Sequence, residues 1–313
     1  MKPIHPVSYS EHEELKAVIL CRPAEVSISE PKVLDEVRWS GAVHVKKAVE
    51  EFEIMKQALE VAGVEVIEYS SYLSENDQAL SKQLIHRVFV RDLACVFGTT
   101  MIPGEAGTFM RKPQYMQSHI LFQDWFPDSF QIRENNELKA LEFGDVMVLN
   151  KNAVLINAGM RTSLDSVDQI KQTIFSSGFS EIAVINLPRN SDTMHLDMNG
   201  NVAGKDVFIA KAFMRHFPVH VSMEANTRYE MLETFLKRHG FDIHWLHQYD
   251  SLPDINYLNL NPETILISKA AHTQRLKQHS QVDKLNFIEV EVSELEKAGG
   301  GIRCMTLPLV RKG

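Results

Sequence analysis

The most informative stretch of the chain is Gly299-Gly300-Gly301-Ile302-Arg303-Cys304-Met305-Thr306-Leu307-Pro308-Leu309. Its three glycines allow backbone or ligand to approach closely, and they precede one cysteine at the edge of a short apolar strand. A thiol in that place would be reachable from a pocket, which suggests that Cys304 is a nucleophile if its surroundings make it a thiolate. The alternative is that Cys304 is a small buried hydrophobic residue before a C-terminal strand.

The other two cysteines, Cys21 and Cys95, lie in apolar runs and are expected to be structural. The three cysteines form no C-x-x-C pair and leave an odd one, which suits a reducing cytosol better than a disulfide framework. No segment approaches the length of a membrane span, and residues 1–15 lack the apolar region of a signal peptide. The sequence therefore predicts a cytoplasmic protein without a membrane partner.

The composition is that of an ordinary globular protein, since 44% of the 313 residues are hydrophobic and 24% are charged. The net charge of -8, without a dense Lys/Arg block, argues against binding of nucleic acid or of an anionic membrane. It is compatible with an acidic pocket for a small cationic substrate. The sequence leaves the oligomeric state open, a homodimer included.

Strand-like and helix-like segments alternate along the chain, which predicts an α/β fold. No Gly/Ser/Pro-rich linker divides it, so we expect a single domain over residues 1–313. A doubly wound sheet would give a similar order, but no strand precedes G-x-G-x-x-G or G-x-x-x-x-G-K-[ST], so nucleotide binding has no motif support. The predicted strands are 16–21, 64–69, 87–97, 146–150, 153–157, 182–187, 207–210, 243–246, 264–268 and 287–292, and the predicted helices are 45–62, 163–177, 225–239, 270–279 and 293–296, the last with Ser293 as its N-cap.

Four further segments carry polar residues where strands begin or end. They are Phe89-Val90-Arg91-Asp92, Leu141-Glu142-Phe143-Gly144-Asp145, Gly159-Met160-Arg161-Thr162-Ser163 and Met194-His195-Leu196-Asp197. In a strand, His195 and Asp197 would point to the same face. Each segment alone also has an ordinary structural explanation, such as a surface ion pair, a solvated turn or a helix cap. Because the His-x-Asp pair lacks a further ligand at metal-site spacing, we expect no metal.

Together these segments bring a thiol, a histidine and four carboxylates near strand ends, namely Cys304, His195, Asp92, Glu142, Asp145 and Asp197. Carboxylates clustered without a metal motif favour a cationic partner, because their mutual repulsion is costly. A planar guanidinium satisfies them well, since it offers five N–H donors. A thiolate could attack its carbon, while a histidine could protonate the departing amine and then deprotonate water.

These motifs resemble those of the arginine deiminase branch of the guanidino-group modifying enzymes, in the pentein superfamily. Residues 15–23 resemble that family's first strand, 89–92 its Phe-Thr-Arg-Asp motif, 141–145 its Glu-Gly-Gly-Asp motif, 194–197 its histidine motif and 299–309 its cysteine motif. The five matches follow the family's order and cover nearly the whole chain. The resemblance implies a pentein α/β-propeller, with five ββαβ-like units around a pseudo-fivefold axis and the active site in the central channel.

The resemblance also assigns roles to the catalytic residues. Cys304 would be the nucleophile and His195 the general acid and base. Asp92 and Asp197 would grip the guanidinium nitrogens, and Glu142 would assist that binding.

The same resemblance implies a set of substrate-binding residues. Phe89 would lie against the guanidinium plane in a cation–π contact. Arg161 and Arg111 would hold a substrate α-carboxylate, and Asp145 would act as an orienting group.

The function implied is that of a hydrolase without metal or cofactor, acting on arginine or a methylated or related guanidino compound through a Cys304 thiouronium. If an amine replaces water, the same residues catalyse amidino transfer, which is the alternative. Glu142 stands where related amidinotransferases often carry Asp, and this favours the hydrolase. A third reading, a pentein that only binds, is disfavoured because a scaffold needs neither Cys304 nor His195.

Three departures from the family pattern bear on the substrate. Phe143 replaces a glycine of Glu-Gly-Gly-Asp and is expected to add a ring near the channel. Leu93 replaces the proline that usually follows Arg-Asp. The chain is also shorter than arginine deiminases usually are and is similar in length to dimethylarginine dimethylaminohydrolases.

Overall fold

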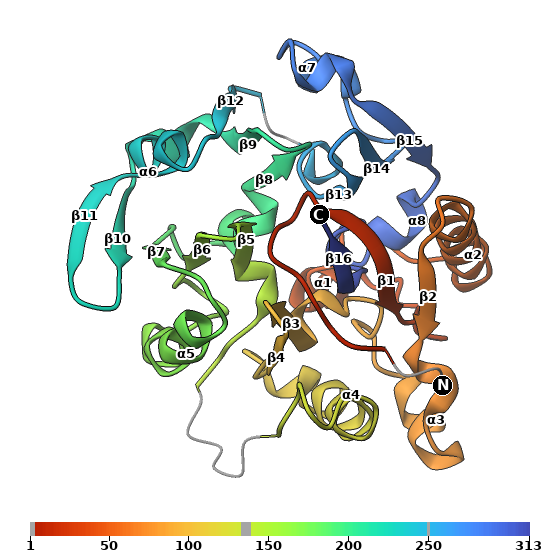
Figure 1. The fold of residues 1–313 in the computed structure, drawn as a ribbon. Helices are drawn as coiled ribbons and strands as arrows, with labels where there is room; N and C mark the ends of the chain where they lie inside the picture. The colour runs from red at the N-terminus through yellow and green to blue at the C-terminus, as the bar shows by residue number, and fades with distance from the viewer. Residues whose placement is uncertain (1–3, 133–138, 249–250) are drawn as a thin grey trace.

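The computed structural model describes residues 4–132, 139–248 and 251–313, which adopt an α/β fold (Figure 1). Within these residues the strands form five sheets, of three, five, three, three and two strands. Figure 1 shows the sheets distributed around the middle of the molecule, with the longer helices toward the outside. The longer helices are α2 (Val45–Val61), α4 (Lys112–Trp125) and α5 (Leu164–Ser176), and the short helix α6 (Leu232–Arg238) also lies toward the outside.

One arrangement of strands recurs: an antiparallel pair, a helical crossover, and a third strand parallel to one member of the pair. Strands β5 (Val146–Asn150) and β6 (Ala153–Asn157) are antiparallel, and β7 (Glu181–Ile185) runs parallel to β6 after α5. The other complete sets are β8 (Gly200–Ala203), β9 (Val207–Lys211) and β12 (Asp242–Leu246); β13 (Leu258–Asn261), β14 (Thr264–Ser268) and β15 (Asn286–Val290); and β16 (Leu307–Lys312), β1 (Glu14–Leu20) and β2 (Glu65–Glu68).

The two-stranded sheet follows the same order in reduced form. Strand β3 (Ala94–Phe97) is antiparallel to β4 (Thr100–Pro103), and α4 follows. A parallel bridge between Met101 and Phe130 then takes the place of a third strand. The order strand, strand, helix, strand expected from the sequence is therefore complete in three sheets, is completed by the late strand β16 in the β16–β1–β2 sheet, and lacks its last strand in the two-stranded sheet.

Strand β16 positions the cysteine segment, because it begins three residues after Cys304. It pairs antiparallel with β1, which is also paired with β2 and lies in the middle of the sheet. The segment before β16 is thereby fixed to strands from the other end of the chain.

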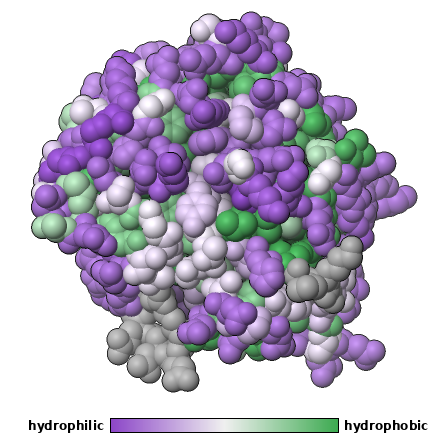
Figure 2. Space-filling view, in the orientation of Figure 1, coloured by the Kyte–Doolittle hydropathy of each residue, from purple (hydrophilic) through white to green (hydrophobic). Residues whose placement is uncertain are grey.

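Most predicted elements are confirmed. Nine of the ten predicted strands lie within two residues of an observed strand at each end, and the helices predicted at 45–62 and 163–177 are α2 and α5. In α2 the apolar spacing buries one face, formed by Ala48, Phe52, Met55 and Leu59 together with Glu51. The hydrophobic side chains pack into five buried clusters, and Figure 2 shows a mostly hydrophilic surface on the face in view.

Four predictions about local structure are wrong. The helix predicted at 225–239 begins as β11 (Thr227–Met231), an edge strand of alternating exposure paired with β10 (Pro218–Ser222), and only α6 is helical. The helix predicted at 270–279 is limited to α7 (Thr273–Leu276).

The strand predicted at 87–97 is extended only in β3, because Arg91–Leu93 form a 3-10 turn. The short helix α8 (Ser293–Glu296) has Val292 rather than Ser293 at its N-cap position.

No helix in the described part of the chain is long and apolar enough to cross a membrane.

Candidate active site

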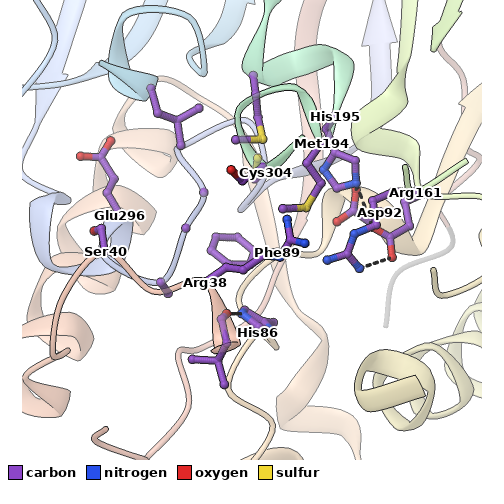
Figure 3. A pocket seen from close by; sticks show the side chains of 18 of the residues that line it. Arg38, Ser40, His86, Phe89, Asp92, Arg161, Met194, His195, Glu296 and Cys304 are labelled. Atoms are coloured by element: carbon purple, nitrogen blue, oxygen red, sulfur yellow. Dashed lines mark hydrogen bonds and ion pairs between the residues drawn. The ribbon is translucent and has the colours of Figure 1, made fainter. Parts of the chain in front are cut away.

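A cavity of about 820 Å³ brings most of the predicted site residues together. Seven of the nine line it: Phe89, Asp92, Arg111, Glu142, Arg161, His195 and Cys304. The other two, Asp145 and Asp197, are fully buried behind this lining. Figure 3 shows Cys304 and His195 in one part of the cavity, with Asp92 and Arg161 on one side and Glu296 and Ser40 on the opposite side.

Backbone hydrogen bonds hold Cys304 in a turn before β16. Its N–H donates to Oδ1 of Asn256 at 3.1 Å, and its carbonyl accepts from the N–H of Arg91 at 3.1 Å. The Asn256 amide also donates to the carbonyl of Asp197 at 3.0 Å. One asparagine therefore joins the cysteine turn to the turn that carries the predicted guanidinium-binding aspartate.

The glycines before Cys304 are required for close packing against the cavity wall. A Cβ on Gly300 would lie 2.5 Å from Cε1 of the Phe89 ring, far inside van der Waals contact. Gly299 has a φ of 98°, in the left-handed region that favours glycine. The glycine run thus lets the cysteine turn approach the ring that is predicted to cover the substrate.

Asp197 links the nucleophile to a buried arginine. Its Oδ2 lies 3.6 Å from Sγ of Cys304 and accepts a hydrogen bond from Nη1 of Arg303 at 2.8 Å. Its Oδ1 is buried and has no hydrogen-bond partner among the residues that the structure describes. A buried carboxylate oxygen without a donor is unfavourable, which makes this oxygen a candidate acceptor even though Asp197 lies behind the cavity lining.

His195 lies between two carboxylates. Its Nε2 is 2.8 Å from Oε2 of Glu142 and 4.0 Å from Oδ1 of Asp92. Glu142 is held in turn by the N–H of Gly107 at 2.8 Å, and Asp92 by the N–H of Gly144 at 2.8 Å. The histidine is therefore surrounded by acceptors that favour its protonated form.

This arrangement determines the proton affinity of the histidine. Burial alone would lower the pKa of His195, but the Asp92 charge and the Glu142 hydrogen bond outweigh it and raise the pKa to about 10. The same contacts, with the charge of Arg111, keep the pKa values of Asp92 and Glu142 below their usual range despite burial. At neutral pH the cluster therefore holds an imidazolium and two carboxylates.

The surroundings of Cys304 favour its neutral form, whereas those of His195 favour the charged form. Burial, followed by the negative charges of Asp197 and Asp92, raises the pKa of the Cys304 thiol well above its usual value. In the free protein Cys304 is therefore a protonated thiol. A cation bound between the two aspartates would favour its ionisation.

A model of the family named "Arginine deiminase" matches residues 69–239 and 247–311 of this chain. The chain belongs to the arginine deiminase family.

Two relatives by sequence show the extent of the match. The chain is 22% identical over 308 residues to the uncharacterized protein YkgA of Bacillus subtilis (strain 168), covering 97% of this chain and 95% of that protein. It is 24% identical over 265 residues to the arginine deiminase of Latilactobacillus sakei subsp. sakei (strain 23K), covering 72% of this chain and 61% of the relative. This family member therefore spans about three fifths of the length of that arginine deiminase.

Solved structures show the same fold at low sequence identity. Dimethylarginine dimethylaminohydrolase from Pseudomonas aeruginosa superposes with a TM-score of 0.69 at 17% identity, covering 94% of this chain and 99% of the other. The inosamine-phosphate amidinotransferase of Streptomyces griseus superposes with a TM-score of 0.68 at 14% identity, covering 98% and 97%. Both comparisons establish the fold of this arginine deiminase family member.

Within the family motifs, two expectations from the sequence need correction. His195 and Asp197 do not share a strand face, because Leu196–Met198 form a 3-10 turn that directs His195 to Glu142 and Asp197 to Arg303. The ring of Phe143 does not border the cavity. It is fully buried and packs 6.2 Å from the ring of Phe97.

Asp145, the last residue of the Glu-Gly-Gly-Asp-like motif, does not line the cavity and accepts hydrogen bonds from one backbone N–H and one side-chain amide. Its Oδ1 accepts from the N–H of Leu196 at 3.0 Å and from the amide of Asn157 at 2.7 Å. Burial raises the pKa of Asp145 to about 7. It anchors the backbone of Leu196, the residue that follows His195.

Two residues of this site, Arg303 and Asn256, were not predicted from the sequence. Arg303 is 1% exposed and donates to Asp197, to Oε1 of Glu11 at 2.9 Å and to the carbonyl of Val146 at 2.8 Å. Asn256 lies in a segment without a recognised motif. The position of Arg303 beside Cys304 was a usable signal, whereas no local pattern indicated Asn256.

The side chains of Asp92, Glu142 and His195 are also close enough together to be considered as ligands of a metal ion. One ligand atom each from Asp92, Glu142 and His195 lies within 4.8 Å of the others. The guanidinium of Arg111 is already 2.6 Å from Asp92 in that cluster. The charge of the carboxylates is therefore compensated by protein groups.

Proposed function

We propose that this protein is a cysteine-dependent hydrolase that acts on the guanidino group of arginine or of a methylated or related compound. The observation that carries the proposal is Oδ1 of Asp197, which has no hydrogen-bond partner in the described part of the chain, while Oδ2 of the same carboxylate lies 3.6 Å from the Cys304 sulfur. A guanidinium N–H supplies the missing donor and brings the guanidino carbon next to the thiol.

Binding and activation are coupled in this proposal. The guanidinium lies between Asp92 and Asp197, with Phe89 against its plane. Burial and, after it, the charges of Asp197 and Asp92 raise the pKa of Cys304; the positive charge of the substrate offsets the two carboxylate charges and so favours loss of the thiol proton. Arg161, which lines the same cavity, binds a substrate carboxylate.

The reaction then has two halves. The Cys304 thiolate forms a bond to the guanidino carbon, and the bond from that carbon to the leaving amine breaks as His195 donates a proton to the nitrogen. The covalent product is a thiouronium. Water, deprotonated by His195, attacks the same carbon, and the carbon–sulfur bond breaks to release a ureido product.

The finer features of the fold and setting belong to the same proposal. The five recurring strand sets form a pentein propeller with a pseudo-fivefold axis, in one catalytic domain. The unpaired cysteines Cys21, Cys95 and Cys304 support a reducing, cytoplasmic setting.

A panel of guanidino compounds tests the reaction class. Arginine, methylated arginines, agmatine and guanidino acids are each incubated with the protein and scored for ureido product, with intact-mass detection of an adduct on Cys304. We expect a ureido product from at least one compound. Product formation only when an acceptor amine is added would identify an amidinotransferase instead, and no reaction or adduct with any compound would refute the proposal.

The reactivity of Cys304 should depend strongly on pH and on the charge of the reagent. Because its pKa is raised well above the usual value, alkylation by a neutral haloacetamide should accelerate about tenfold per pH unit from pH 7 to 9. A haloacetamidine of the same size, which is cationic, should react much faster at pH 7. Peptide mapping separates Cys304 from Cys21 and Cys95, and a rate plateau below pH 8 would contradict the raised pKa.

A further inference from the structure

The outer strand of the five-stranded sheet, β11, has an open edge. It pairs with β10 on one side, and no strand in the described part of the chain pairs with its other side. Figure 1 shows β11 at the outer left of the molecule. Strand edges of this kind pair readily with a strand of another chain unless a bulge or a proline blocks them. Strand β11 contains no proline, and its register with β10 is regular over all five residues.

The hydrogen bonds at the two ends of the β10–β11 hairpin show which backbone groups of β11 face outward. The Met223 N–H donates to the Asn226 carbonyl at 2.9 Å, and the Leu232 N–H donates to the Phe217 carbonyl at 3.1 Å. Antiparallel partners alternate between hydrogen-bonded and non-hydrogen-bonded pairs, so the even-numbered residues of β11 are bonded to β10. The backbone groups that point to the open edge are those of Thr227, Tyr229 and Met231.

The side chains of β11 form two faces of different character. On one face Tyr229 is 75% exposed, Met231 is 42% exposed, and the Tyr229 ring lies 4.8 Å from the ring of His220 on β10. On the other face Nη2 of Arg228 lies 3.4 Å from Oε1 of Glu230, with their side chains 39% and 12% exposed. The edge therefore carries one positive and one negative charge, placed symmetrically about Tyr229.

We propose that β11 pairs antiparallel with β11 of a second copy of this chain, about a two-fold axis at Tyr229. The outward backbone groups of Thr227 then bond to those of Met231 in the second copy, and Tyr229 bonds to Tyr229. Arg228 of each copy lies opposite Glu230 of the other. Each residue pair occurs twice, as a two-fold contact requires, and the five-stranded sheet continues across the axis.

Charge selects this register over its neighbours. Outward-facing residues pair only with outward-facing residues, so the adjacent two-fold registers place the axis at Arg228 or at Glu230. Either axis puts a charged residue opposite its own copy, and like charges directly opposite each other destabilise a strand pair. The axis at Tyr229 instead gives two pairs of opposite charge. Because the charge pattern is complementary to its own reverse, the occupant that fits the edge is a second copy of β11.

Sedimentation velocity between about 1 and 300 µM protein tests the charge pairing, since contacts this small are weak and transient. We expect the mean mass of the parent to rise toward that of a dimer. Arg228→Glu and Glu230→Arg each place like charges opposite one another and should each weaken self-association by on the order of tenfold or more. Mixed together, the two variants have complementary edges and should form a mixed dimer. A parent that stays monomeric, or a mixture that associates no better than its components, would overturn the proposal.

A second pair of variants tests the backbone contact without changing a charge. Met231 has a φ of -71°, close to the value that proline fixes, and its N–H points away from β10. Met231→Pro should therefore keep the hairpin, as circular dichroism can verify, and weaken the dimer by on the order of tenfold or more, because a bond to Thr227 is lost in each copy. Met231→Leu, the control, retains the N–H and should associate like the parent. Equal association of these two variants would exclude β11 as the contact, and this comparison decides if a charge variant does not fold.

Discussion

Replacing Cys304 with serine should reduce turnover of a guanidino substrate by about 10⁴-fold or more, because the hydroxyl is a far weaker nucleophile at the same position. The side chain is 6% exposed and its N–H and carbonyl are bonded to Asn256 and Arg91, so the isosteric change should leave the turn in place. Steady-state rates of ureido release measure the effect.

Two controls accompany this variant. The unfolding midpoint and the affinity for the substrate should stay close to those of the parent, and Cys95→Ser, at a cysteine outside the cavity lining, should keep its activity. Appreciable turnover by Cys304→Ser would remove this residue from the role of nucleophile.

Replacing Arg303 with methionine should destabilise the protein by about 3–5 kcal/mol, as expected when one partner of a buried ion pair is removed. Arg303 is 1% exposed and is bonded to both Asp197 and Glu11, so its loss leaves two carboxylates buried without their cation. Urea unfolding monitored by circular dichroism gives the change in free energy.

The matched control is Lys139→Met, which removes a cation from an exposed pair with Asp165. Exposed pairs contribute little, so its unfolding midpoint should not change measurably. If Arg303→Met were equally neutral, the buried triad would not be important for stability. Adding Glu11→Gln to Arg303→Met should recover part of the loss, since one uncompensated charge is removed.

Motif order predicted much of the candidate site because chemistry restricts residue types there. Cys304, His195, Asp92 and Glu142 were selected from local segments, and the structure places them around one cavity. The local segments did not show which positively charged residue pairs with each carboxylate. Asp92 is paired with Arg111, 19 residues away, and Asp197 with Arg303, 106 residues away.

That limit changes the electrostatic interpretation of the site. Clustered carboxylates in a sequence suggest a binding site for a cation, because the sequence does not show which arginines will lie beside them in the folded protein. In the folded protein, Arg111 and Arg303 already compensate Asp92 and Asp197. In the proposed mechanism, a substrate would therefore enter a largely compensated network, in which Oδ1 of Asp197 has no hydrogen-bond partner among the described residues.

The errors in local structure have a similar origin. Thr227–Met231, predicted as the first part of a helix, instead pairs with β10 as an edge strand of alternating exposure. Arg91–Leu93 and Leu196–Met198 form 3-10 turns of three residues each. Turns this short have no periodicity of their own, so both segments are interpreted as parts of strands from the sequence alone. In each case contacts with distant residues outweigh the local preference.

The pairing of β16 with β1 has a consequence for biosynthesis. On a ribosome the chain emerges from its N-terminus, so β1 is exposed long before the strand that will pair with it has been made. The turn carrying Cys304 becomes anchored only when β16 arrives. A nascent chain that contains Asp92, His195 and Asp197 but not yet residues 304–312 therefore lacks both the proposed nucleophile and the strand that anchors its turn.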